Sequence, residues 1–363
     1  MKVKINKAAL VKTLNGLKGA ANRNILFNAE NDTLSLTGVG ETAAIRITLG
    51  GDNVQVEHDG KMLIEHKFIT EAVKKMDGEE VTINATDGVC MLYDEKSKFR
   101  LHVENEANFP AVDFDGEDAF EISTSVLADA VNATDYCISR VYSTERPFIN
   151  GLQLESAGGQ ITAIASDGYR AAKKTIVYDG PAFKVIIPLQ TLGLLKDTVF
   201  KDAPEATVKV SFKKNPNTGV SSVIFETEGI KIRSSLIASS FPSLPFSPPF
   251  VGEMTVDRKH LRSVVERSLF LANMAEHETI ELSETDGVKI TTLKQEIGGS
   301  TEEVACTYTG TPLKLSYNAA YLNDTLKAIS DDELKIGFAG EMKPIILSAA
   351  DEVHLILPVL TRE

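Results

Sequence analysis

Residues 80–83 read EVTI, and nearly the same pattern returns as TVKV at residues 207–210 and as ELKI at residues 333–336. Apolar residues at every second position are typical of a strand with one buried face. Val81, Val208 and Leu334 lie 127 and 126 residues apart. This regular spacing predicts that the chain contains three copies of one structural unit.

The sequence around the three stretches supports the repeat. Each stretch follows a segment with helical periodicity, and each unit begins with a short alternating strand, a polar residue and a second helical stripe. The polar residues are Asn6, Ser123 and Asp257, whose side-chain oxygens are good acceptors for the first N–H groups of a helix. The expected helices span residues 6–23, 65–76, 123–140, 188–200, 256–272 and 318–330.

Further alternating runs complete each unit, and Phe109-Pro110 and Phe241-Pro242 end the first two. The pattern predicts an α+β fold of three repeated domains, each with two helices on antiparallel sheet. We place the domains at residues 1–118, 119–248 and 249–363. The alternative is three unrelated α+β domains that resemble one another by chance.

Composition excludes several classes of protein. The chain has 363 residues, 43% of them hydrophobic, and a formal net charge of −13. It holds no apolar run of the roughly 18 residues that a membrane helix needs, and its first residues do not resemble a signal peptide. A cytoplasmic location without a membrane partner is expected. The three cysteines and six histidines show no ligand spacing, so we expect buried reduced thiols and neither a metal nor a cofactor.

Positive charge is concentrated in the expected helices, and negative charge lies mainly in the rest of the chain. The six expected helices together carry +6, which leaves −19 for the other residues. Residues 6–23 alone hold four basic side chains and no acidic one. If the helices share one surface, that surface attracts phosphates while the rest repels them. With 7% aromatic residues and no Trp, base reading is not expected. The alternative is that these cations lie on ordinary solvated helix faces.

Five passages resemble the bacterial sliding clamps, the beta subunits of DNA polymerase III. They lie at Asp32–Gly38, at Lys98–Leu101 with Asn108–Pro110, at Asn150-Gly151 with Ala165–Arg170, at Leu313–Tyr321 and at Leu355–Pro358. The resemblance follows the whole chain in order. It implies a head-to-tail homodimer whose six domains close a ring, with duplex DNA held inside by topology and without sequence preference. The protein would be a non-catalytic subunit of a DNA polymerase holoenzyme, associated with the nucleoid.

The resemblance and the charge pattern together give the candidate DNA-facing residues. These are Lys7, Lys12, Lys18, Arg23, Lys67, Lys74, Lys75, Arg258, Arg262 and Arg267. Arg23 best matches a basic position of the family, and the others are chosen for their charge.

The resemblance also implies a cleft in which short peptide motifs of the replicative polymerase and the clamp loader dock. An apolar floor of this kind buries a Leu or Phe anchor for about 1.5–3 kcal/mol. Its expected walls are Ile149, Ser166, Gly168, Tyr169, Arg170, Pro242, Asn318, Tyr321, Leu355, Leu357, Pro358 and Val359. For Tyr169 and Arg170 the alternative is a purely structural turn after Asp167-Gly168.

For the dimer seam, the resemblance points to an edge strand of the first domain and one of the last. The expected interface residues are Lys96, Lys98, Phe99, Leu101, Leu269, Phe270, Leu271, Glu302 and Glu303. Edge strands can pair across chains, and opposite charges beside them favour one orientation.

Two other classes of function stay open at this stage. An enzyme would need a site built on Asp167 with Arg170, or on Cys137 as a nucleophile, and the sequence offers these residues no partner base, metal spacing or phosphate loop. A repeat-built, β-rich binding protein that does not act on DNA is the second alternative.

Overall fold

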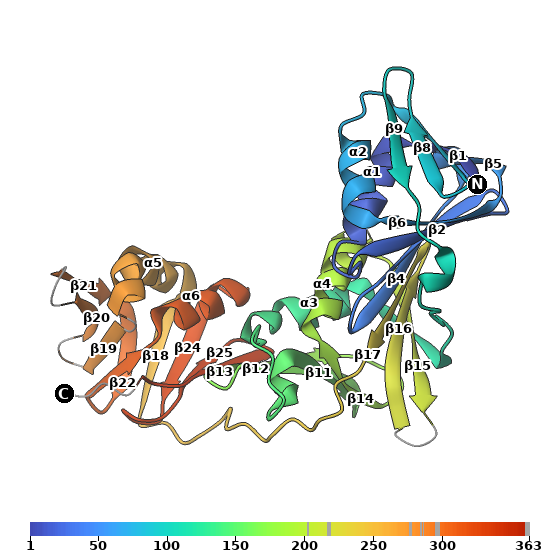
Figure 1. Ribbon diagram of the computed structural model, residues 1–363. Coiled ribbons are helices and arrows are strands. Elements are labelled where there is room, and N and C mark those ends of the chain that lie inside the picture. Colours follow the sequence, from blue (N-terminus) through green and yellow to red (C-terminus); the bar gives the residue numbers. More distant parts are fainter. Residues whose placement is uncertain are drawn as a thin grey trace. The chain divides into compact units, whose positions relative to one another are not determined.

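The computed structural model of the chain describes residues 1–201, 203–215, 219–275, 278–283, 285, 287–294 and 298–359 (Figure 1). Contacts divide the chain into two compact units. The first contains Met1–Ala128 with Ile187–Ala238, and the second contains Asp129–Ile186 with Ser239–Glu363. Each unit is described by itself.

The first unit is built on two antiparallel sheets. The five-stranded sheet has the order β5 (Val54–His58), β1 (Lys2–Asn6), β7 (Glu80–Thr86), β8 (Val89–Tyr93) and β9 (Lys98–His102). The eight-stranded sheet has the order β10 (Glu117–Ser123), β15 (Thr207–Asn215), β16 (Gly219–Thr227), β17 (Ile230–Ser235), β4 (Ala43–Leu49), β3 (Thr33–Val39), β2 (Asn24–Glu30) and β6 (Gly60–Glu65).

Helices α1 (Lys7–Gly16) and α2 (His66–Lys74) pack against each other in this unit (Figure 1). It also holds α4 (Leu189–Leu194), which continues as a π-helical turn over Leu195–Phe200, and short 3₁₀ turns at Gly51–Asn53 and Glu106–Asn108. Helix α3 (Thr124–Asn132) begins in the first unit and ends in the second.

The second unit also has two sheets. Nine strands follow the order β14 (Phe183–Pro188), β11 (Gly151–Ala157), β12 (Gln160–Ser166), β13 (Arg170–Val177), β26 (Glu352–Ile356), β25 (Ile345–Ser348), β24 (Glu333–Phe338), β18 (Gly252–Asp257) and β22 (Cys306–Gly310). Four more follow the order β21 (Gly298–Val304), β20 (Gly287–Lys294), β19 (Glu278–Ser283) and β23 (Leu313–Tyr317). Helices α5 (Arg258–Ala275) and α6 (Ala319–Ala328) pack together, and 3₁₀ turns span Asp135–Cys137 and Pro147–Asn150.

The three-fold repeat is present in the hydrogen bonding. In every copy the strand before the first helix pairs antiparallel with the strand after the second helix. The paired residues are Ile5 with Val81, Ile122 with Val208, and Val256 with Leu334. The first N–H of each helix then donates to a carbonyl just before the partner strand, at Lys7 to Glu79 (2.8 Å), Thr124 to Ala206 (2.9 Å) and Arg258 to Asp332 (2.8 Å). Three unrelated domains would not share this register.

The predicted caps are confirmed. Side-chain oxygens accept backbone N–H groups of the first helical turn at Asn6 (from Ala9, 3.0 Å), Ser123 (from Ser125, 3.2 Å) and Asp257 (from His260, 2.7 Å). Each satisfies an N–H that the helix itself leaves unpaired.

Three of the expected helices are shorter or less regular than their patterns suggested. Helix α1 ends at Gly16, where the backbone is most costly to order. Helix α3 ends at Asn132, and just beyond this end the Thr134 hydroxyl donates to the Ala130 carbonyl at 2.6 Å. The Thr198 hydroxyl, within the π-helical turn, similarly donates a hydrogen bond to the Leu194 carbonyl at 2.6 Å.

The cysteines lie apart and unpaired. Cys90 and Cys137 are buried, and Cys306 is half-buried. Burial raises the pKa of the Cys90 thiol to about 12, so this group stays protonated and unreactive at neutral pH. Within the described part of the chain, no helix combines the length and the apolar content needed to cross a bilayer.

Candidate functional site

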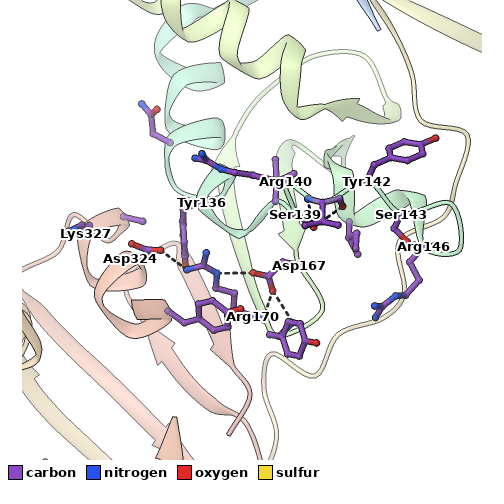
Figure 2. Close-up of a pocket in the computed structure, with 17 residues that line it drawn as sticks. Tyr136, Ser139, Arg140, Tyr142, Ser143, Arg146, Asp167, Arg170, Asp324 and Lys327 are labelled. Atoms are coloured by element: carbon purple, nitrogen blue, oxygen red, sulfur yellow. Dashed lines mark hydrogen bonds and ion pairs between the residues drawn. The ribbon is translucent and has the colours of Figure 1, made fainter. Parts of the chain in front are cut away.

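The second unit contains an open cavity of about 850 Å³. Its lining comes from the end of α3, the turn at Asp135–Cys137, the loop that follows it, the start of β13 and helix α6 (Figure 2). The lining residues are Asn132, Tyr136, Ile138, Ser139, Arg140, Val141, Tyr142, Ser143, Arg146, Ile149, Asp167, Tyr169, Arg170, Tyr321, Asp324, Lys327 and Ala328.

Arg170 organises one end of this cavity. Its Nε donates to Asp167 Oδ2 at 3.0 Å, and one terminal nitrogen donates to Asp324 Oδ2 at 2.9 Å (Figure 2). The guanidinium also lies over two rings, 4.3 Å from the centroid of Tyr321 and 5.2 Å from that of Tyr136. Burial would lower the pKa of Arg170, but the bond to Asp324 and the charge of Asp167 outweigh it, so the pKa is raised and the charge is kept.

A tight turn sets the direction of Arg170 and Tyr169. Asp167 Oδ1 accepts the backbone N–H groups of both residues at 2.9 Å. Gly168 has a φ of +93°, and a Cβ there would lie 3.2 Å from a guanidinium nitrogen of Arg146. Glycine thus permits both the left-handed backbone and the close approach of Arg146. The turn leaves Tyr169 61% exposed, with its ring centroid 6.4 Å from that of Tyr321.

A buried polar network lies behind the cavity wall. The hydroxyl of Tyr136 donates to Thr325 Oγ1 (3.1 Å) and contacts His354 Nδ1 (2.8 Å), while the Thr325 hydroxyl donates to the Tyr321 carbonyl (2.9 Å). Burial lowers the pKa of His354 to about 3, which keeps the ring neutral.

Strand pairing between β13 and β26 brings charge into this network. Lys174 lies opposite Glu352 and forms ion pairs with Asp351 (2.6 Å) and Glu352 (3.7 Å). Glu352 is only 3% exposed, and its burial raises the pKa of this carboxyl. Lys174 and Glu352 thus form a largely buried ion pair between β13 and β26.

The structure brings four predicted cleft residues into the cavity lining: Ile149, Tyr169, Arg170 and Tyr321. The others take positions around it. Ser166 Oγ donates to the Arg170 carbonyl and accepts the Gly168 N–H, Asn318 caps α6, and Leu355 is buried. Leu357 is 38% exposed and donates its N–H to the Tyr169 carbonyl at 2.8 Å. Pro358 bridges to Tyr317, the Val359 N–H donates to Ser316, and Pro242 is exposed.

Sequence reasoning missed Tyr136 and Asp324, which contact Arg170, and the cations Arg140, Arg146 and Lys327. Tyr136, Arg140 and Arg146 lie in irregular segments, and Asp324 and Lys327 lie in a helix of zero expected net charge. No local pattern marked them. Asp324 and Lys327 lie three residues apart on α6, a spacing that places both on one helix face.

The predicted DNA-facing residues divide between the two units. In the first unit, Lys12, Lys18, Arg23, Lys67, Lys74 and Lys75 are exposed, and Lys7 bonds to the Met76 carbonyl. Arg23 also lies near Glu65 (3.3 Å) and Glu104 (3.6 Å), and Lys74 lies 3.9 Å from Glu71. In the second unit, Arg262 pairs with Glu266 at 2.8 Å and Arg267 pairs with Glu302 at 2.7 Å.

Arg258 requires a correction. Its side chain is 11% exposed, and its nitrogens donate to the carbonyls of Asp331 (2.7 Å), Leu326 (3.0 Å) and Ser330 (3.5 Å). These carbonyls belong to the end of α6 and the loop after it, which the helix cannot satisfy internally. The guanidinium is therefore used inside the protein, and Arg258 is not available to face DNA.

Both strands predicted for the dimer seam lie at sheet edges. β9 is the last strand of the five-stranded sheet, with Phe99 and Leu101 half-buried and Lys96 and Lys98 exposed. β21 is the last strand of the four-stranded sheet, and its Glu302 is engaged by Arg267. Leu269 is half-buried, while the side chains of Phe270 and Leu271 lie outside the described part of the structure.

Comparisons with known proteins agree along the whole chain. Family models match residues 1–113, 121–243 and 250–359 as the N-terminal, central and C-terminal domains of the DNA polymerase III beta subunit. The chain is 27% identical over 353 residues to the beta sliding clamp of Staphylococcus aureus, with 93% of this chain and 91% of that protein covered.

Solved structures are similar in fold. A DNA polymerase sliding clamp from Bacillus subtilis has a TM-score of 0.89 with 24% identity, and each chain is covered completely. The DNA polymerase III beta chain of Streptococcus pneumoniae has a TM-score of 0.90 with 22% identity, over 99% of this chain and 100% of that one.

Proposed function

The chain belongs to the family of DNA polymerase III beta subunits, and from this premise we propose that it is a sliding clamp that encircles duplex DNA and tethers a replicative polymerase. The observation that carries the proposal is the three-fold repeat of the strand pairs, in one register, along a chain that the three domain models cover. We take the domains as residues 1–118, 119–248 and 249–363.

A ring of six such domains needs two chains, and the edge strands supply a suitable joint. We infer that β9 of one copy pairs with β21 of the other, since each leaves a row of backbone groups without a neighbour in its own sheet. Lys96 and Lys98 would then lie near Glu303, which is exposed and forms no ion pair among the described residues. This attraction favours the head-to-tail arrangement.

Encirclement explains how an acidic protein acts on DNA. Exposed cations on the segments carrying α1 and α2 attract phosphates without reading bases, so the clamp is not fixed in register. Retention then depends on closure of the ring and little on affinity. The protein has no catalytic task in this account, and it acts on nucleoid DNA in the cytoplasm.

The cavity of the second unit is the proposed docking cleft for peptide motifs of the polymerase and the clamp loader. It is concave and has aromatic walls from Tyr136, Tyr169 and Tyr321, with Arg170 fixed among them. Such sites bind an apolar anchor and orient it with a few polar groups. A β-rich binding protein that does not act on DNA is the disfavoured alternative.

Retention on circular DNA tests the proposal. The protein is loaded onto a closed plasmid with the clamp loader of the source cell and then filtered in about 0.5 M NaCl, which screens phosphate contacts. We expect it to stay with the closed circle and to be lost once a restriction enzyme cuts the plasmid. Equal loss from closed and cut plasmid would refute topological retention.

A further inference from the structure

We propose that the cavity of the second unit selects acidic peptides, through a cationic rim formed by Arg140, Arg146 and Lys327. This inference rests on the proposed function, because it names the chemistry of the peptide that the docking cleft accepts. It concerns the charge that flanks the apolar anchor.

The first observation is the balance of charge in the cavity lining. Four cationic side chains line it against two carboxylates, although the whole chain has a net charge of −13. Both carboxylates, Asp167 and Asp324, are bound to Arg170. Their charge is therefore already neutralised in part by a single guanidinium within the wall.

The second observation is that the other three cations are not neutralised. Arg140, Arg146 and Lys327 are all exposed, and among the described residues none of them lies within 4.0 Å of a carboxylate oxygen. Other basic side chains of this unit, such as Lys174, Arg262 and Arg267, do form ion pairs. The rim thus presents three charges that only solvent or a ligand can satisfy.

The third observation is their placement. Figure 2 shows Arg140, Arg146 and Lys327 at separate sides of the depression, with Arg170 between Asp167 and Asp324. The exposed ring of Tyr142 stands on the same loop as Arg140 and Arg146. A concave site with low-dielectric walls focuses such a field and raises the local concentration of anionic ligands. A peptide seated on the aromatic wall would carry its flanking residues past these cations.

Exposed charge pairs contribute little individually, on the order of a two- to five-fold change in affinity each. Three of them predict that an acidic peptide binds about ten-fold more tightly than its uncharged counterpart at low ionic strength. Because exposed pairs are screened, the preference should shrink as salt is added.

The test uses two labelled nine-residue peptides, and binding to the full-length protein is followed by fluorescence anisotropy. Both carry a Leu-Phe pair, flanked in one by three aspartates and in the other by three asparagines. We expect the roughly ten-fold preference for the aspartate peptide in about 50 mM NaCl and a clearly smaller one in about 500 mM NaCl. The double variant Tyr169→Ala with Leu357→Ala should bind neither peptide, which locates binding in the cleft.

A matched pair of charge variants assigns the preference to the rim. Arg140→Gln with Lys327→Gln should reduce the aspartate-to-asparagine ratio to about two- or three-fold. Lys335→Gln with Lys343→Gln removes two exposed cations of the same unit away from the cavity and should leave the ratio unchanged.

The contradicting outcomes are distinguishable. If both peptides bind equally to the wild-type protein, acidic selectivity is refuted while the docking cleft stands. If neither binds, the docking cleft itself is refuted. Displacement of the aspartate peptide by a twelve-residue oligothymidylate at comparable concentration would overturn the inference in favour of a nucleic-acid site on this rim.

Discussion

Replacement of Arg170 by Gln removes the charge that holds one wall of the cavity together. Arg170 is 11% exposed, as is common for a paired internal cation, and Asp167 is 13% exposed. The substitution leaves Asp167 with its two backbone N–H donors but without its counter-ion. Tyr321 and Tyr136 also lose the cation that lies over their rings.

The structure allows the loss to be estimated. A charged hydrogen bond between groups as buried as Arg170 and Asp167 contributes about 1.5–3 kcal/mol. The pair with Asp324, which is 42% exposed, adds about 0.5 kcal/mol, and each ring contact adds about 0.5–1 kcal/mol. The glutamine recovers part of this through its own hydrogen bond and a lower desolvation cost. We expect a net loss of about 2–3 kcal/mol in local stability.

Hydrogen exchange measured by mass spectrometry suits this prediction, because the chain forms more than one compact unit and a single unfolding midpoint would mix them. Backbone amides of residues 160–177 and 345–359 should exchange about 30- to 150-fold faster in R170Q. Arg140→Gln, at an exposed arginine of the same cavity, is the matched control and should change exchange little. Exchange in R170Q no faster than in R140Q would refute the structural role of Arg170.

Two further substitutions test the seam and the buried carboxyl. Phe99→Asp places a charge on the edge strand β9 and should weaken the dimer by at least about 100-fold, so that light scattering gives the 39.4 kDa mass of the monomer. The control Val177→Asp, at an 89% exposed strand end, should stay dimeric. A dimer in both variants would contradict the proposed seam. Because burial raises the pKa of Glu352, the folded state binds this proton more tightly than the unfolded chain, so the carboxyl opposes folding most at pH 7 and least near pH 4.5. The protection of residues 345–359 from hydrogen exchange in E352Q, minus that in the wild type, should therefore be larger at pH 7 than at pH 4.5. A difference independent of pH would contradict the assignment.

The repeat could be predicted because its signals are local. Asn6, Ser123 and Asp257 each precede a helical stripe, and each now accepts an N–H of the first turn. The alternation around Val81, Val208 and Leu334 likewise indicated which residues face the core, since successive side chains of a strand point to opposite faces. Caps and alternation depend on neighbours within a few positions, so the sequence alone carries them.

The joining of strands over long distances could not be predicted from periodicity. Pairing of β17 with β4 places Ile232 opposite Ile45, and pairing of β13 with β26 places Lys174 opposite Glu352. An alternating strand looks the same whichever strand it pairs with. Whether the second face of such a strand is also buried depends on which other strands and helices cover it in the folded protein.

The roles of individual charges also depended on tertiary structure. Arg258 and Arg262 stand one helical turn apart in α5, and composition treats them alike. The end of α6 and the loop after it bring three carbonyls to Arg258, whereas Arg262 forms its ion pair with Glu266 on its own helix. The cavity residues Tyr136 and Asp324 were missed for the same reason, because their role is to contact Arg170, which only the folded structure brings next to them.

Electron microscopy of the purified protein, at a concentration where it is dimeric, tests most directly whether this chain forms a ring around DNA. We expect class averages of a closed ring made of two chains, with the segments that carry Lys12, Lys18 and Lys67 lining the hole. An open particle, or a ring whose hole is lined by the acidic residues of the sheets, would contradict the claim that this chain encircles DNA.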